Sequence, residues 1–246
     1  MRRVCSWPLV VLVIVLATTR ASCVSPHGPG VCAFSCDDGI CPDGFECRSD
    51  AYCHQIGSDE PCTGFPPACS SSCPRDMTPA PVAASCVCVD RFEASQGDGG
   101  VATSRYRATP WVNVTWEDAE AACEAAGKRL CTEEEWQVSC AGPLGSAYPY
   151  GDGYDPGACN VYTAEGQGLV LPTGSLSTCA GGYPGLFDMS GNVWEWTATC
   201  TSAGCRARGG SSRVGDSEND LGCGGAWDAD PAVGNESLGF RCCLTP

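Results

Sequence analysis

Two carboxylates, Asp188 and Glu195, are the residues of this sequence best placed to bind a metal ion. They stand at the ends of a short segment in which Gly191 permits a tight turn. Calcium takes hard oxygen ligands, including carboxylates and backbone carbonyls, and it tolerates irregular loops. The spacing therefore predicts a calcium site over residues 188–195. The alternative is a pair of solvated carboxylates beside an aromatic core.

Two helices and a loop-rich body must position this segment. A first helix is predicted between Thr115, a good N-cap, and Gly127, because its apolar residues fall on one face at helical spacing. A second helix should begin with a capping box at Thr132 and end at Gly142. The chain beyond it is rich in Gly, Pro, Ser and Tyr, with only short strand-like runs. This order of elements predicts an α+β fold.

Four strings of residues, taken in their order along the chain, resemble the formylglycine-generating enzyme family, also called the sulfatase-modifying-factor domain. The resemblance implies a compact, loop-rich α+β fold related to C-type lectins, here over residues 86–246. The strings are Gly127–Trp136, Gly185–Thr197, Arg208–Ser211 and Leu238–Cys242.

The resemblance also implies two calcium sites. In the family, the first site uses positions that fall here on Asp188, Gly191, Val193 and Glu195, with Gly191 and Val193 donating backbone oxygens. The second site maps onto a segment that is shorter here than in the enzymes, and an ordinary polar loop is the alternative. Its four candidate ligands are Asn160, Val161, Glu165 and Gln167.

Trp194 and Ser211 fall in the family's substrate cleft. In the enzymes, two cysteines placed three and eight residues after this serine bind copper(I), an ion that soft thiolates suit. Val214 and Asn219 occupy those positions here, so copper is not expected and Trp194 and Ser211 are interpreted as framework residues. Residues 86–246 contain no histidine, which argues against non-haem iron chemistry and against a base-activated nucleophile.

The 22 cysteines indicate an oxidising compartment, where disulfides persist. Eight lie between Cys32 and Cys73 and twelve between Cys86 and Cys243, and both numbers are even. The resemblance implies two disulfides, and closeness in sequence predicts a third, local one. These three pairs are Cys123–Cys242, Cys140–Cys223 and Cys200–Cys205.

The first 85 residues predict three segments. Residues 1–22 combine a basic start with a short apolar run, as in a secretory signal peptide. Cleavage after Ala21 and a lipoprotein signal that leaves an acylated Cys23 are the two alternatives. Residues 23–75 predict a cysteine-rich EGF-like or knottin-like module stabilised by disulfides, with zinc binding as the alternative. Residues 76–85, with two prolines, predict a stiff linker.

The net charge of −15 disfavours contact with nucleic acid and anionic membranes, so membrane attachment would come only through a lipid anchor. The sequence thus predicts a secreted or cell-envelope protein with a sulfatase-modifying-factor-like domain. Its predicted role is that of a non-catalytic, calcium-stabilised binding or structural module with a protein or glycan ligand. The alternatives are a formylglycine-generating oxidase acting on a sulfatase cysteine and a calcium-assisted carbohydrate-binding module.

Overall fold

The computed structural model describes residues 34–35, 45–47, 52–57, 73–82, 85–163, 168–213 and 216–246. The predicted signal peptide, Cys23, most of the cysteine-rich module, Glu165, Gln167 and Val214 lie outside these residues. Near the N-terminus, three short antiparallel strands pair in the order β1-β3-β2: β1 (Phe34–Ser35), β2 (Phe45–Cys47) and β3 (Tyr52–Gln55). None of the helices in the described ranges is long and apolar enough to cross a membrane.

The two predicted helices are present and begin at the predicted caps. Helix α1 (Trp116–Ala125) starts after Thr115, whose side chain accepts a hydrogen bond from the Asp118 amide. Helix α2 (Glu133–Ala141) has the complete capping box between Thr132 and Glu135, and it ends at Gly142, which has a positive φ of 64°. Local side-chain chemistry at the helix ends therefore determines both boundaries.

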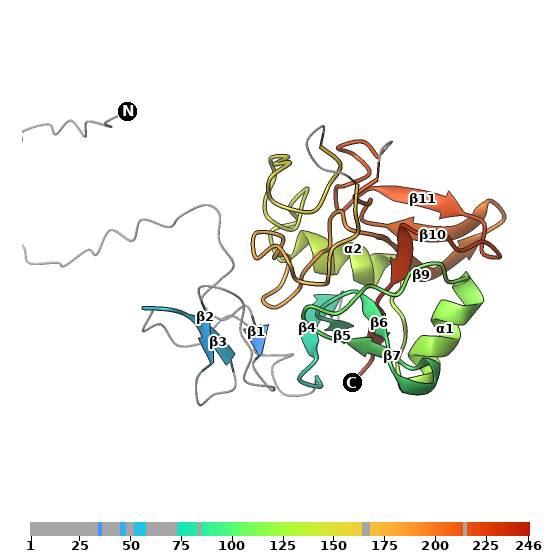
Figure 1. Ribbon diagram of the computed structural model, residues 1–246, viewed down its shortest axis with the longest axis horizontal. Coiled ribbons are helices and arrows are strands. Elements are labelled where there is room, and N and C mark those ends of the chain that lie inside the picture. Colours follow the sequence, from blue (N-terminus) through green and yellow to red (C-terminus); the bar gives the residue numbers. More distant parts are fainter. Residues whose placement is uncertain are drawn as a thin grey trace, which may run out of the picture.

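The first of the two larger sheets brings the beginning and the end of the domain together. Its strand order is β4-β5-β13-β8, and every pair in it is antiparallel. Figure 1 shows β4 and β5 close to the C-terminus of the chain. The strands are β4 (Met77–Val82), β5 (Ser85–Asp90), β8 (Arg129–Leu130) and β13 (Cys242–Leu244).

The linker predicted for residues 76–85 is wrong over most of its length, because Met77–Val82 forms strand β4. Pro79 and Pro81 lie opposite Cys88 and Cys86 in this edge strand. Alternate residues of a strand direct their backbone nitrogens to the same side, so two prolines two residues apart can both face away from the ladder. The domain therefore begins before residue 86.

The second large sheet has the order β11-β10-β9-β12, with β12 parallel to β9 and the other pairs antiparallel. A smaller antiparallel hairpin and a single 3-10 turn precede α1 in the chain. The strands of the large sheet are β9 (Trp194–Thr201), β10 (Gly204–Arg208), β11 (Ala226–Ala229) and β12 (Leu238–Phe240). The hairpin consists of β6 (Ala94–Gln96) and β7 (Ala102–Ser104), with the turn η1 (Asp98–Gly100) between them.

Two buried clusters hold these layers together. One joins α1 to the second sheet through Cys123, Trp196 and Phe240, all of which are fully buried. The other joins α2 to the first sheet through residues that include Trp136 and Val87. Together the two helices and two sheets form the predicted loop-rich α+β domain (Figure 1).

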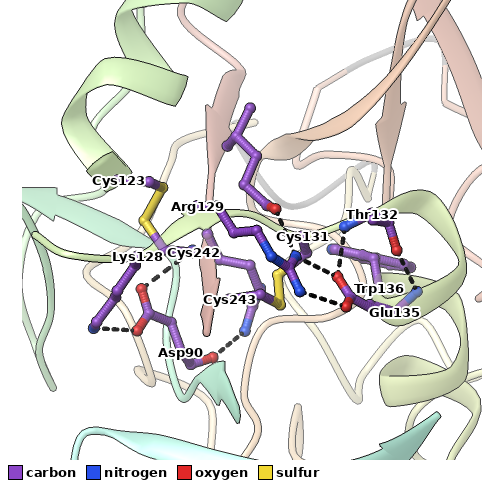
Figure 2. The surroundings of a disulfide bond; sticks show 12 residues. Asp90, Cys123, Lys128, Arg129, Cys131, Thr132, Glu135, Trp136, Cys242 and Cys243 are labelled. Carbon is purple, nitrogen blue, oxygen red and sulfur yellow. Dashed lines mark hydrogen bonds and ion pairs between the residues drawn. A yellow bond between two sulfur atoms is a disulfide. The ribbon is translucent and has the colours of Figure 1, made fainter. Parts of the chain in front are cut away.

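Disulfides connect distant parts of this domain. The adjacent Cys242 and Cys243 tie β13 to α1 and to the residue that follows β8 (Figure 2). Cys86 is also disulfide-bonded. The Cys73–Cys88 bridge joins the last cysteine of the N-terminal group of eight to a cysteine of the C-terminal group of twelve. All three predicted pairs are formed. The six bridges resolved in full are Cys73–Cys88, Cys123–Cys242, Cys131–Cys243, Cys140–Cys223, Cys159–Cys179 and Cys200–Cys205.

A buried ion pair lies next to the Cys123–Cys242 bridge (Figure 2). The ammonium group of Lys128 is 2.6 Å from the fully buried carboxylate of Asp90 and 2.8 Å from that of Asp76, whose side chain is 42% exposed. Asp90 also accepts a hydrogen bond from the Cys242 amide. Burial raises the pKa of Asp90 to about 6, although Lys128 lowers it. Lys128 is therefore the cation that offsets a carboxylate in the core.

Candidate functional site

The 188–195 loop turns sharply and packs against a second predicted loop. Asp188, Gly191 and Asn192 all have a positive φ, between 57° and 73°. A Cβ atom on Gly191 would lie 2.4 Å from the Asn160 carbonyl oxygen, so only glycine fits this close approach. Asn160 and Asn192 are joined by two hydrogen bonds, of 2.7 and 2.8 Å. The structure thus places the first half of the second predicted calcium site against the first site.

Glu195, the last residue of this loop and the second of β9, pairs with an arginine. Its fully buried carboxylate accepts hydrogen bonds from Arg241 Nε (2.6 Å), Arg241 Nη2 (2.5 Å) and Trp136 Nε1 (2.6 Å). Both oxygens of Glu195 are therefore engaged by N–H donors, which differs from the predicted ligation of calcium by this side chain. A guanidinium suits the position because its planar fork matches both carboxylate oxygens.

Arg241 also contacts two other segments. Its Nη1 donates to the Asp90 carbonyl, and its Nη2 donates to the Phe187 carbonyl, both at 3.0 Å. Strand β12 runs parallel to β9 and ends directly before Arg241, and this arrangement brings the guanidinium to Glu195. The two sequence strings that contain these residues therefore meet at one buried ion pair.

Glu93 is a buried acid of this site that the sequence did not reveal. Its carboxylate accepts hydrogen bonds from Asn192 Nδ2 at 2.6 Å and from the Val193 amide at 3.2 Å. Asp188 accepts one from the Gly174 amide at 2.6 Å. Glu93 and Glu195 are fully buried and Asp188 is nearly so, which leaves three carboxylates around the single guanidinium of Arg241.

The surplus of buried acid changes how these groups bind protons. Burial, followed by the nearby charges of Asp188 and Glu195, raises the pKa of Glu93 well above its usual range. Burial also raises the pKa of Asp188 to about 7, although the Gly174 amide and Arg241 lower it. Around this loop the buried carboxylates therefore outnumber the one guanidinium, that of Arg241, that offsets them.

The chemistry of the donors suits calcium better than a transition metal, because all the candidate ligand atoms are oxygens. Within the described ranges, no group of three or more His, Cys, Asp or Glu side chains is placed to hold a metal ion. A cation at Asp188 would therefore need backbone oxygens as well, as the family resemblance implies for Gly191 and Val193. Calcium binding stays a prediction, and Glu165 and Gln167 lie outside the described residues.

A cleft of about 350 Å³ opens where β9 begins. Trp194 and Ser211, the two predicted cleft residues, both line it. The rings of Trp194 and Trp227 of β11 meet edge to face, with their centroids 5.9 Å apart, and Trp227 is 39% exposed. The residues that line the cleft are Trp194, Ser211, Arg213, Asp216, Asp220, Ala226, Trp227, Asn235 and Ser237.

Asp216 holds the two predicted cleft residues in place. Its carboxylate accepts hydrogen bonds from the Ser211 amide (2.7 Å), the Ser211 hydroxyl (2.6 Å) and Trp194 Nε1 (3.3 Å). The Ser211 hydroxyl also accepts a hydrogen bond from the Arg213 amide. With its proton directed at a carboxylate and no histidine in residues 86–246, Ser211 lacks the partner that would activate it as a nucleophile.

Around the rest of the cleft lie polar side chains that the sequence did not single out, Arg213, Asp216, Asp220 and Asn235. Asp220 accepts hydrogen bonds from the amide and hydroxyl of Ser217. Arg213 forms an ion pair of 2.7 Å with Glu236. Asn219, which occupies one of the family's cysteine positions, is exposed. Arg213, Asn219 and Asp220 come from the chain between β10 and β11, and Glu236 comes from the turn before β12.

Solved structures with the same fold define the class of this domain. Treponema denticola variable protein 1 superposes with a TM-score of 0.55 at 18% identity, over 65% of this chain and 85% of that protein. PvdO from Pseudomonas aeruginosa superposes with a TM-score of 0.50 at 19% identity, over 65% of this chain and 81% of that protein. The domain thus has the formylglycine-generating-enzyme-like, C-type-lectin-like fold.

The family follows from the sequence. The family model described as "Sulfatase-modifying factor enzyme 1-like domain" matches residues 61–245, and the chain belongs to this family. "Inactive C-alpha-formylglycine-generating enzyme 2" of Bos taurus is 33% identical over 153 residues, 54% of this chain and 49% of the relative. "Formylglycine-generating enzyme" of Thermomonospora curvata is 36% identical over 122 residues, 46% of this chain and 40% of the relative. The chain thus spans about half or less of the length of these relatives.

Proposed function

We propose that this protein is an exported, non-catalytic binding module that uses the cleft lined by Trp194 and Trp227 to hold its ligand. One observation carries the proposal. All twelve cysteines from Cys86 to Cys243 lie in the described part of the chain, and all twelve are disulfide-bonded. An oxidase that activates oxygen on copper(I) needs free thiolates, and none of these twelve cysteines is free.

The lining of the cleft supports a role in binding. It combines two tryptophans with carboxylate, carboxamide, hydroxyl and guanidinium groups, and its volume falls within the range of about 300–1,000 Å³ typical of small-ligand sites. Side chains such as Ser211 and Asn235 are held by short-range hydrogen bonds, so the cleft is formed before a ligand arrives. The extensive disulfide bonding supports export, because such bridges persist in oxidising compartments.

Lipid attachment is a separate and more specific question within this proposal. An acylated Cys23 would anchor the protein to the cell envelope, whereas cleavage after Ala21 would release it. Mass spectrometry of the mature N-terminus distinguishes the two, because acylation adds the mass of its fatty acids to Cys23.

The proposal predicts that the protein makes no formylglycine. Purified, oxidised protein incubated with copper, oxygen, a reductant and a Cys-x-Pro-x-Arg peptide should give no aldehyde by mass spectrometry. An active formylglycine-generating enzyme under the same conditions is the positive control. Thiol titration of the denatured, non-reduced protein should find no free thiol among the twelve cysteines. Robust aldehyde formation that disappears in Cys223→Ser would show that this protein is an oxidase.

We also propose that calcium stabilises the 188–195 loop through Asp188 and backbone oxygens, and the surplus of buried carboxylates supports this. A ligand that binds only the folded state stabilises it, by about 2.7 kcal/mol at a concentration 100 times its Kd. Melting curves should therefore shift upwards with excess calcium compared with chelator. The shift should be larger at pH 8 than at pH 6, because the pKa of Asp188 is about 7 and metal ligands must be deprotonated.

Asp188→Asn should abolish this calcium response. Asp98→Asn, the same change at an exposed position, should leave it intact. A melting temperature of the wild-type protein that calcium does not change would rule out the calcium site.

A further inference from the structure

We propose that the Cys200–Cys205 disulfide is a thiol-exchange site, at which a dithiol attacks the sulfur of Cys200 and opens the bridge. The bridge lies at the hairpin tip, residues 200–205, where the chain turns from β9 into β10. The inference goes beyond the proposed binding function, because it assigns covalent chemistry to a part of the domain other than the cleft.

Accessibility distinguishes Cys200 from the other cysteines. Among the cysteines whose burial the structure describes, Cys200 alone is exposed, and the others are buried or half-buried. Its partner Cys205 is only 3% exposed and packs in the cluster that contains Trp196. A thiolate must reach the sulfur that it attacks, and exposed bridges are the labile ones in folded proteins. The sulfur open to attack is therefore that of Cys200.

The exchange takes place in two steps. In the first, one thiolate of the dithiol forms a bond to Cys200 Sγ, the S–S bond breaks, and its electron pair leaves on Cys205 Sγ. In the second, the other thiol of the same molecule attacks the mixed disulfide and displaces Cys200. The dithiol is thereby oxidised to a disulfide, and its two electrons and two protons end on Cys200 and Cys205 as thiols.

The surroundings of Cys205 favour a dithiol over a monothiol. Burial among apolar side chains disfavours the Cys205 thiolate. Strand pairing holds this thiolate opposite Cys200, so it displaces an attached monothiol and closes the bridge again. The second thiol of a dithiol competes with this reversal, because it attacks within the same mixed disulfide. The co-reactant class is therefore a dithiol.

The bridge fixes a hairpin tip that the β-ladder holds weakly. The register of β9 and β10 shifts next to the tip, so that residues 197–199 lie opposite the single residue Arg206. The Ala198 amide there donates to the Cys131 carbonyl (2.8 Å) instead of to β10. Beyond this irregularity the two strands form only the residue pairs Cys205–Cys200 and Gly204–Thr201. Opening the bridge should therefore release the tip, because weakly held segments open locally.

The change stays local and reversible. Strand β10 remains paired with β11 from Cys205 to Arg208 (Figure 1), so Cys205 keeps its place when the bridge opens. The bridges of the core, such as Cys123–Cys242 and Cys159–Cys179, connect residues that are at most 3% exposed. They should not exchange while the domain is folded. The site thus makes the order of one hairpin depend on the redox state of the compartment.

Partial reduction of the full, oxidised chain tests the site. The folded protein is treated with limiting dithiothreitol, free thiols are alkylated with iodoacetamide at intervals, and peptide mapping identifies the alkylated cysteines. Cys200 and Cys205 should be alkylated at least about tenfold faster than the cysteines of the buried Cys159–Cys179 bridge. Tryptophan fluorescence, which reports unfolding, should not change meanwhile. The inference is overturned if any of the other five bridges resolved in full opens first, or if Cys200–Cys205 opens only as the native fluorescence is lost.

A monothiol tests the proposed order of attack. Glutathione at the same total thiol concentration should open the bridge at least about fivefold more slowly than dithiothreitol. The mixed disulfide trapped by acid quenching should carry glutathione on Cys200, as assigned by fragmentation of the peptide. Glutathione on Cys205, or equal opening by the two reagents, would contradict attack at Cys200 by a dithiol.

The double variant Cys200→Ser with Cys205→Ser separates the tip from the rest of the domain. It represents the opened state, so the amides of residues 201–204 should exchange with deuterium at least about tenfold faster than in the wild type. The amides of β12 (Leu238–Phe240) should keep their protection. Limiting dithiothreitol should produce the same pattern in the wild type and no further change in the variant. Unchanged exchange at the tip, or loss of protection in β12 as well, would overturn a local release.

Discussion

Replacing Arg241 by methionine should destabilise the protein by about 5 kcal/mol or more, because the guanidinium offsets several buried acids at once. Removing one partner of a buried ion pair costs roughly 3–5 kcal/mol, since the remaining charge stays buried without compensation. Arg241 is surrounded by three buried carboxylates rather than one. A domain is usually stable by only about 5–15 kcal/mol, so Arg241→Met should fold poorly or melt far below the wild type.

Arg213→Met is the matched control for Arg241→Met. The same chemical change then removes the ion pair between Arg213 and Glu236. The side chain of Arg213 is 39% exposed and that of Glu236 is 69% exposed. Exposed pairs contribute about 0–1 kcal/mol, so Arg213→Met should unfold at nearly the same denaturant concentration as the wild type. Both variants are compared under oxidising conditions by urea unfolding. A loss below about 1 kcal/mol in Arg241→Met would contradict the central role of this guanidinium.

Two further measurements separate charge from packing at this site. The double variant Glu195→Met with Arg241→Met should recover part of the loss, because it removes the carboxylate that the single variant leaves unpaired. The stability lost in Arg241→Met should also be smaller at pH 5 than at pH 8. The folded-state pKa of Asp188 is about 7 and that of Glu93 is raised, so at acid pH both can carry a proton in place of the missing charge.

Lys128→Met should cost about 3–5 kcal/mol, the second-largest expected effect, because it removes the cation paired with the fully buried Asp90. The loss depends on pH in a defined direction. The pKa of Asp90 in the folded protein is about 6, above its ordinary value of 3.8, so the folded state holds this proton more tightly than the unfolded state. Ionisation of Asp90 therefore lowers the free energy of unfolding of the wild type as pH rises from about 4 to 6.

Without Lys128, Asp90 should hold its proton more tightly still. The loss of unfolding free energy in Lys128→Met should therefore grow from pH 5 to pH 8. Asp76→Asn serves as the control. Asp76 contacts the same ammonium group, but its side chain is 42% exposed, so its loss should cost no more than about 1 kcal/mol. Denaturant unfolding at the two pH values measures both variants. A deficit in Lys128→Met that does not depend on pH would show that Lys128 acts through packing rather than through Asp90.

Features that depend on neighbouring residues were predictable from the sequence. The caps at Thr115 and Thr132 lie within one turn of the amides they bind, so both helix starts were placed correctly. The Cys200–Cys205 bridge closes a short segment and was predicted from proximity alone. The family, its fold and the two long-range bridges came from a resemblance to known sequences, because spacing alone does not determine which distant cysteines pair.

Sequence-based prediction was wrong where the same local pattern of residues is compatible with two different structures. Prolines in residues 76–85 indicated a linker, yet Pro79 and Pro81 belong to edge strand β4. A strand edge and an extended connector allow the same backbone conformation of proline, so only the partner strand distinguishes them. Similarly, Asp188 and Glu195 look equivalent as calcium ligands in the sequence, but in the structure Glu195 pairs with Arg241, whereas Asp188 accepts a hydrogen bond from the Gly174 amide.

The sequence by itself determined the family, the α+β fold, the helix ends and the expectation of extensive disulfide bonding. Only the tertiary structure decided which charges meet. Glu93 joins Asn192 across 99 positions, and Arg241 joins Glu195 across 46. The cleft likewise takes Trp194 from β9, Asp216 from the chain after β10 and Trp227 from β11. Ion pairs and pockets depend on distances of a few ångströms in space, and the packing of the strands sets those distances between segments that are far apart in the chain.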